Sequence, residues 1–296
     1  MRSKNTGARK ALETVIHLIF LLCGIVAVGF VLVISVYLII SGLPAIREIG
    51  LFKFLFGQVW DPTNTTTGAQ YGILPFILTS IYGTAGAMVI GVPIGLMTAI
   101  FLSKLAPAPV AAVIRTAVQL LAGIPSVVYG LVGMIVLVPL IRTTFSLGSG
   151  ACLLAAILVL SIMVLPSIIN VSETALRAVP REYEEASLAL GATAAETYFR
   201  VSLHAAGGVA TAVVLGVGRA IGEAMAIIMV AGNVANMPGL FQSVRFLTTG
   251  IISGMSYAPV GSLYQQALFS IGLVLFLFIM LINVFLNVFI KKRKED

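Results

Sequence analysis

Two ionisable residues, Arg219 and Glu223, lie inside a long apolar stretch at about residues 207–231. Placing such a residue at the centre of a membrane costs roughly 2.5–3.5 kcal/mol on insertion scales, so charges inside spans are rare and usually functional. Residues four apart share one face of a helix, with Glu223 about one turn beyond Arg219. Gly218 and Gly222 stand beside them and would let another helix approach closely.

This charged pair allows two interpretations, and both can hold at once. A guanidinium beside a carboxylate forms an ion pair that fixes the packing of helices. Alternatively, the planar donor fork of Arg219 binds an anion in transit while Glu223 holds or releases it, because a guanidinium contacts phosphate oxygens through two parallel hydrogen bonds. We expect the substrate path at Arg219 and Glu223.

Motifs of catalysis are absent from the sequence. It has no Gly-Lys pair of a phosphate-binding loop, no His-Glu-x-x-His and no Gly-x-Ser-x-Gly. The two histidines, His17 and His204, have no plausible triad partner nearby in sequence. We therefore expect no ATPase site, no catalytic residue, no metal and no cofactor in this chain.

The composition is that of a protein dissolved in lipid. Of 296 residues, 59% are hydrophobic and 10% are charged, against about 25% charged in an average soluble domain. A spanning helix needs about 20 mainly apolar residues. Six stretches meet this requirement: 15–41, 72–102, 111–141, 151–171, 207–231 and 264–290. The predicted fold class is an all-α integral membrane protein of about six transmembrane helices.

The positive charges orient these spans. Of the 18 Lys and Arg residues, the segments on one side of the six spans carry 13, those on the other side carry four, and Arg219 lies within a span. Because positive residues collect in cytoplasmic segments, both termini are predicted to be cytoplasmic, as an N-terminal tail at 1–14 and a basic tail at 291–296. The net charge of +7 is therefore explained by membrane topology, and no nucleic-acid partner is expected.

The third stretch is interrupted by Gly123-Ile124-Pro125-Ser126. Proline removes a backbone hydrogen bond and bends a helix. Lipid does not tolerate exposed broken backbone, so the break belongs inside a bundle or along a cavity. Either it is a packing kink, or Pro125 and Ser126 line the substrate path.

The only long cytoplasmic loop, at about residues 172–206, is predicted to be structured. Pro180 suits the first position of a helix, and the glutamates that follow suit its positive N-terminal end; they are Glu182, Glu184 and Glu185. Gly191 is a typical helix stop. Thr193-Ala194-Ala195-Glu196 has the form of a capping box that starts a second helix.

The same loop resembles the EAA signature of ABC importer permeases. The family pattern is Glu-Ala-Ala-x3-Gly-x9-Ile-x-Leu-Pro, and this chain has Glu185-Ala186-Ser187, then Gly191, then Val201-Ser202-Leu203-His204. Serine, valine and histidine depart from the pattern. In that family the loop forms a coupling helix that docks on a cytoplasmic ATPase. The resemblance gives this role to Glu185, Ala186 and Gly191.

Three further segments are similar to permeases of the phosphate-specific importers: 71–77, 123–130 and 218–225. Met229-Val230-Ala231-Gly232-Asn233 and Trp60-Asp61-Pro62 resemble the C-type subunit of those importers. The resemblance covers about residues 50–290 and implies a type I ABC importer permease fold. Residues 15–290 would form the permease domain, with the coupling loop at 172–206.

The resemblance also implies the partners and the function. The chain would form one half of a permease heterodimer in the bacterial inner membrane, with a cytoplasmic ATPase dimer and an extracytoplasmic phosphate-binding protein. Closure of the ATPases would switch the permease by alternating access. Two alternatives stay open: a permease for another oxyanion, sulfate or molybdate, and an ATP-independent anion carrier.

Overall fold

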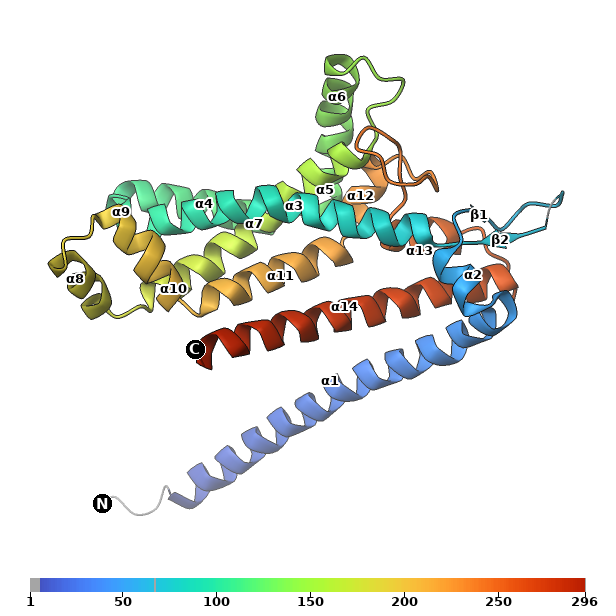
Figure 1. The fold of residues 1–296 in the computed structure, drawn as a ribbon. Helices are drawn as coiled ribbons and strands as arrows, with labels where there is room; N and C mark the ends of the chain where they lie inside the picture. Colours follow the sequence, from blue (N-terminus) through green and yellow to red (C-terminus); the bar gives the residue numbers. More distant parts are fainter. Residues whose placement is uncertain (1–5, 67, 296) are drawn as a thin grey trace.

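The computed structural model describes residues 6–66 and 68–295, which are almost entirely helical apart from one short hairpin (Figure 1). The segments η1 to η3 are π-helical turns within longer helices. In chain order the elements are α1 (Thr6–Ile49), α2 (Leu51–Phe56), β1 (Trp60–Asp61), β2 (Gln70–Tyr71), α3 (Leu74–Ile100), η1 (Phe101–Leu105), α4 (Ala108–Gly123), α5 (Ser126–Val132), η2 (Gly133–Leu137), α6 (Val138–Thr144), α7 (Leu153–Arg177), α8 (Arg181–Ala189), α9 (Ala194–Glu196), η3 (Thr197–Ser202), α10 (Leu203–Ala205), α11 (Gly208–Gly222), α12 (Met225–Val230), α13 (Leu247–Met255) and α14 (Leu263–Glu295).

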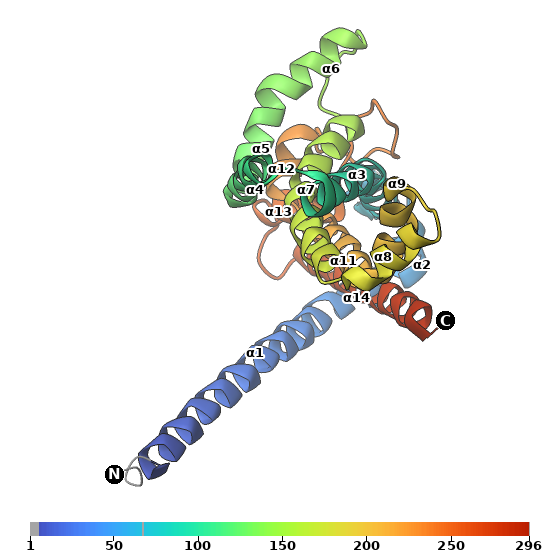
Figure 2. The same cartoon turned by 90° about the vertical axis from the view of Figure 1, so that its left-hand side faces the viewer.

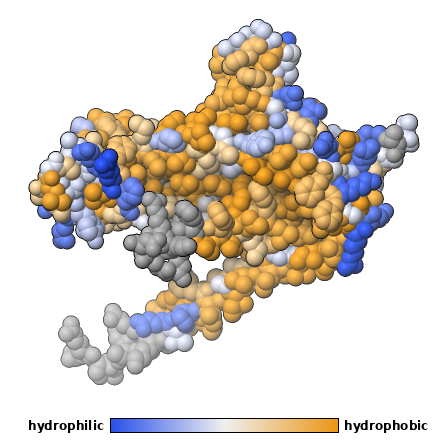
Figure 3. Space-filling model, in the orientation of Figure 1, coloured by the Kyte–Doolittle hydropathy of each residue, from blue (hydrophilic) through white to orange (hydrophobic). Residues whose placement is uncertain are grey.

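Five helices in the described residues are long and apolar enough to span a membrane, and a sixth span results if the bent pair Ala194–Ala205 and Gly208–Gly222 is one span. The five are Leu12–Ile49, Leu74–Leu105, Ser126–Thr144, Leu153–Arg177 and Leu263–Phe285. The visible surface is broadly apolar between polar residues at its two ends (Figure 3). The all-α membrane fold with about six spans is confirmed.

The two ends of the molecule differ in what they carry. The start of α1, the end of α14 and the loop helices α8 to α10 lie toward one end, and the β1–β2 hairpin lies at the other (Figure 1). This arrangement agrees with the charge bias that places both termini and the long loop in the cytoplasm. The predicted tails are mostly helical, since α1 begins at Thr6 and α14 continues to Glu295; residues 1–5 and 296 lie outside the described part.

The centre of the bundle is the packing of α3 against α7. Close approach is possible because two glycines of α3 face branched side chains of α7. A Cβ on Gly91 would lie 2.7 Å from a methyl group of Val164, and one on Gly95 would lie 2.7 Å from Ile168. Helix α11 packs on both α7 and α3, so these three helices form the part of the fold that positions the site.

Helix α1 contacts the bundle mainly through α14. Gly42 allows the contact, because a Cβ there would lie 3.1 Å from the backbone of Phe269, and the Ser270 hydroxyl donates to the Gly42 carbonyl at 2.6 Å. From that contact α1 diverges from the other helices toward the N-terminus (Figures 1 and 2).

Two spans are broken. The predicted third span at 111–141 is two helices, since α4 ends at Gly123 and α5 begins at Ser126 after the extended Ile124 and Pro125. This confirms the break at Pro125, although α4 is a separate, shorter apolar helix. The predicted fifth span at 207–231 was expected to be continuous, and that expectation is wrong: α11 ends at Gly222 and α12 begins at Met225.

Candidate functional site

The backbone at Glu223 is extended, with φ −73° and ψ 133°. Its carboxylate Oε1 accepts a hydrogen bond from the Ala226 amide at 3.1 Å, and its carbonyl accepts one from the Thr248 hydroxyl at 2.8 Å. A carboxylate is favourable at the start of α12, because it satisfies a free amide and interacts with the helix dipole. Glu223 therefore stabilises a helix break.

Arg219 lies in the last turn of α11 and its side chain is exposed. The prediction that it shares a helical face with Glu223 is wrong, because the helix ends between the two residues. Within the described part of the chain, the ion pairs are Lys104–Glu184, Arg115–Glu173 and Arg177–Glu173, and Arg219 is in none of them. The guanidinium is thus left without a carboxylate partner.

The glycines beside Arg219 also have no neighbour within the chain. A Cβ on Gly218 or Gly222 would meet no atom within 4 Å. Gly123, at the other break, is equally open. The helix that these glycines were predicted to admit is therefore not one of the described helices of this chain.

The two breaks lie side by side because α5 packs on α12. A Cβ on Gly130 would lie 2.8 Å from the Ala226 Cα. Pro125 is exposed and Ser126 is half-buried at the start of α5. The structure thus packs α5, which begins at Ser126, on α12, which follows Glu223, whereas α11 with Arg219 packs on α7, α3 and α14.

Tyr129 and Thr248 are site residues that sequence reasoning did not single out. The Tyr129 hydroxyl donates to the Leu121 carbonyl at 2.7 Å, so it joins α5 to α4 across the proline break. Tyr129 lay in the segment 123–130 that carried the resemblance, whereas no sequence pattern marked Thr248.

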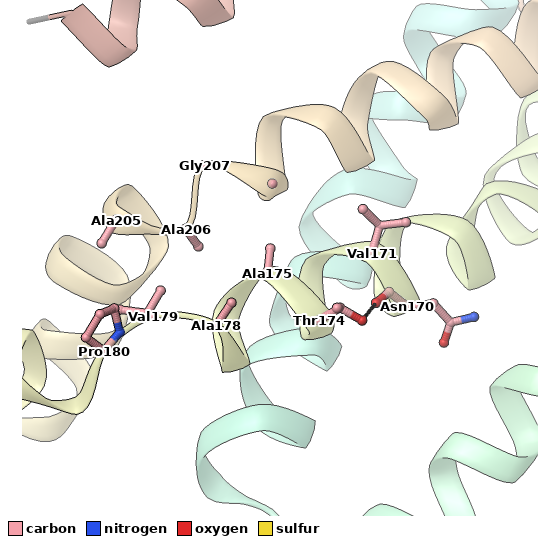
Figure 4. Close-up of a pocket in the computed structure, with 11 residues that line it drawn as sticks. Asn170, Val171, Thr174, Ala175, Ala178, Val179, Pro180, Ala205, Ala206 and Gly207 are labelled. Carbon is pink, nitrogen blue, oxygen red and sulfur yellow. Dashed lines mark hydrogen bonds between the residues drawn. The ribbon is translucent and has the colours of Figure 1, made fainter. Parts of the chain in front are cut away.

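A cavity of about 630 Å³ lies elsewhere, between the end of α7 and the α10–α11 corner (Figure 4). Its lining is mostly alanine, valine and glycine, with Asn170 and Thr174 as the polar side chains. The Thr174 hydroxyl donates to the Asn170 carbonyl at 2.8 Å. None of the predicted path residues lines this cavity, and its lining provides no charge for an anion.

The predicted loop at 172–206 begins later than expected, because α7 continues to Arg177, but the rest of it has the predicted helix–glycine–helix form. Helix α8 begins at Arg181, one residue after Pro180, and ends before Gly191, whose φ of 87° is in the left-handed region that favours glycine. The Gly191 amide donates to the Leu188 carbonyl at 3.0 Å. The EAA-like residues Glu185, Ala186 and Gly191 are all exposed, and Leu190 beside them is 90% exposed.

The capping box at the next helix is also confirmed. The Thr193 amide donates to the Glu196 carboxylate at 3.0 Å, and the Thr193 hydroxyl accepts from the Glu196 amide at 3.3 Å. The hydrogen bonds from the Thr193 amide and hydroxyl lower the pKa of Glu196, and nearby Arg200 acts in the same direction. The helix that starts here bends by 73° between Ala205 and Gly208, just after His204.

Comparison with known proteins places this arrangement in one family. Residues 91–295 match the family described as the binding-protein-dependent transport system inner membrane component. YqgH of Bacillus subtilis, a probable ABC transporter permease protein, is 40% identical over 269 residues, which are 88% of this chain and 86% of YqgH. PstC of Haemophilus influenzae, a phosphate transport system permease protein, is 34% identical over 284 residues, 88% of each chain.

A solved structure agrees on the fold. The MetNI methionine ABC transporter, in an inward-facing conformation, matches with a TM-score of 0.55 and 21% identity, covering 75% of this chain and 94% of that chain. At this identity the likeness concerns the fold alone. The chain therefore belongs to the family of binding-protein-dependent transport system inner membrane components and is the multi-pass permease component of an ABC importer, which works with a binding protein and an ATPase.

Proposed function

We propose that this chain is a C-type permease subunit of a phosphate importer and moves inorganic phosphate into the cytoplasm by alternating access. The observation that carries the proposal is Arg219, a guanidinium that has no carboxylate partner among the described residues and lies at a helix break in an apolar bundle. A cation in such surroundings attracts an anion, and its donor fork matches the oxygens of phosphate. The similarity to PstC of Haemophilus influenzae supports phosphate as that anion.

In this proposal, the side of the two helix breaks that has no neighbour among the described residues faces the second permease subunit of a heterodimer. Gly123, Gly218 and Gly222 leave room there for helices of another chain. The exposed residues Glu185, Ala186 and Gly191 would contact one protomer of the ATPase dimer. The phosphate-binding protein would dock at the opposite end, where the β1–β2 hairpin lies.

The test is uptake of radiolabelled phosphate by vesicles that hold this chain with its candidate second permease, ATPase and binding protein. Phosphate should enter only with ATP, and a large excess of sulfate or molybdate should not compete. Competition by sulfate or molybdate would assign the path to another oxyanion. Uptake that survives removal of nucleotide and follows an ion gradient would contradict the ATP-driven mechanism.

Arg219→Gln should lower uptake by about tenfold to a hundredfold, since a hydrogen bond to a charged group contributes about 1.5–3 kcal/mol. The matched control is Arg142→Gln, which removes an exposed arginine of α6 away from both breaks. Copurification with the partners should be unchanged in both variants. Normal uptake by Arg219→Gln would eliminate the role of this residue in transit.

A further inference from the structure

Glu184 differs from the other glutamates of the coupling loop because it points into the protein. Glu182 and Glu185 are exposed, whereas the side chain of Glu184 is only 15% exposed. Its Oε1 lies 2.5 Å from the Lys104 Nζ and accepts a hydrogen bond from the Ser202 hydroxyl at 2.9 Å. The Lys104 side chain is 12% exposed, so both charges of the pair are largely removed from water.

Lys104 belongs to η1, the π-helical end of the second span. Within the described residues α8 packs mainly against η3 of its own loop, and the Glu184–Lys104 pair joins it directly to a membrane helix. Shielding from water strengthens this attraction, and the Ser202 hydroxyl satisfies the carboxylate further. The Lys104–Glu184 pair therefore connects α8 to the end of the second span.

The same end of α3, which continues as η1, also contacts the two helices α4 and α7. The Arg115 Nη2 donates to the Leu102 carbonyl of η1 at 3.1 Å, and the Arg115 Nε lies 2.7 Å from the Glu173 carboxylate on α7. Arg177 lies 2.9 Å from the same carboxylate oxygen. Helices α4 and α7 thus also contact this end of the second span, so η1 connects the coupling loop to both of them.

The far end of α3 reaches the break in the fifth span. The Ser80 hydroxyl accepts a hydrogen bond from the Leu247 amide at 3.0 Å, at the start of α13. The next residue, Thr248, donates to the Glu223 carbonyl. Ser80 and Lys104 lie about 36 Å apart along one helix, at roughly 1.5 Å per residue. Figure 1 shows α3 running from the side of α13 to the side of α9.

We infer that α3 moves as a rigid helix and transmits displacement of the coupling helix α8 to the helix break beside Arg219. Lys104 and Glu184 are positioning residues at its cytoplasmic end, and Ser80 and Thr248 connect its outer end to Glu223. Although Pro93 removes one hydrogen bond in the middle of α3, the close packing of Gly91 and Gly95 on α7 supports the helix there. This inference rests on the proposed role of the loop in ATPase coupling.

The test measures phosphate taken up per ATP hydrolysed, in vesicles with the complete complex and its binding protein. Lys104→Met, Glu184→Gln and Thr248→Val should each lower this ratio by about fivefold or more, the lower end of the usual range for coupling between sites. ATP hydrolysis and copurification with the ATPase should persist. The double variant Glu184→Gln with Thr248→Val should be no worse than the worse single variant, because both act on one route.

Two further variants distinguish a role of the Lys104–Glu184 pair in coupling from a purely structural role. Exchanging the pair, as Lys104→Glu with Glu184→Lys, should restore most of the ratio. The control Glu182→Gln removes an exposed carboxylate of the same helix and should leave the ratio unchanged. An unchanged ratio in Glu184→Gln and Thr248→Val, or an exchanged pair that stays uncoupled, would overturn the inference. A wild-type complex that hydrolyses ATP and carries no phosphate would refute the proposed substrate instead.

Discussion

At the scale of single residues, the site depends on the separation of the Glu223 carboxylate from the Arg219 guanidinium. Glu223 is satisfied by the Ala226 amide, and Arg219 is left exposed in the last turn of α11. An ion pair between them would neutralise the arginine and weaken its attraction for an anion. By capping α12, the carboxylate instead stabilises the break that separates it from the guanidinium.

The capping role of Glu223 predicts a difference between two substitutions. Glu223→Ala removes the acceptor for the Ala226 amide and should destabilise the chain by about 1 kcal/mol, as for the loss of other helix caps. Glu223→Gln keeps an amide oxygen at the same position and should cost less. Thermal unfolding of the purified chain in detergent checks this order, and equal midpoints for the two variants would contradict the capping role.

At the scale of elements, the loop from α8 to α10 is defined by local chemistry. The capping box at Thr193 contains a titratable group, Glu196, whose folded pKa is lowered. A carboxylate with a lowered folded pKa stabilises the fold above its unfolded pKa of about 4.3, and the contribution is lost as pH falls through the folded value. The loop should therefore be capped at neutral pH and lose its cap in acid.

Hydrogen exchange of the amides at 194–198 tests this prediction. After correction for intrinsic rates, protection in the wild-type chain should be constant down to about pH 4.3 and fall below it. Thr193→Ala should lose much of that protection already at neutral pH, because it removes the hydroxyl that accepts from the Glu196 amide and donates to the Glu196 carboxylate. Protection of the wild-type chain that rises as the pH falls below 4 would contradict the sign of the effect.

The elements also show what the sequence could and could not predict. Pro125 lacks an amide and so marks a possible break in the third span. Pro93 and Pro166 lie inside the continuous helices α3 and α7, so the residue type alone does not decide where a span breaks. The break at Glu223 has no proline. Gly222 before it favours a helix end, whereas Glu223, Ala224 and Met225 favour helix, so contacts made in the folded chain, such as that of Thr248 with the Glu223 carbonyl, also stabilise the break. That the Glu184 side chain points into the protein could not be predicted either, because its partner Lys104 is distant in the sequence.

At the scale of the whole molecule, the glycines fall into two groups that sequence alone cannot separate. Gly91 and Gly95 are in tight contact with α7, where a Cβ would lie 2.7 Å from Val164 or Ile168. Gly218 and Gly222 face open space. Both groups let helices approach closely, but among the described residues only the first does so within this chain. In the proposed heterodimer, the second group is available to the partner permease.

This contrast predicts that larger side chains in the first group of glycines affect folding, whereas those in the second group affect assembly. Gly91→Leu should lower the yield and thermal stability of the isolated chain, because overpacking a close contact typically costs about 1–3 kcal/mol. Gly218→Leu with Gly222→Leu should leave the isolated chain as stable as the wild type and abolish its copurification with the second permease subunit. Measuring both properties for both variants separates folding from assembly. If the double leucine variant still copurified normally, the open side of α11 would face lipid, and the path beside Arg219 would have to be closed by other surfaces of the complex.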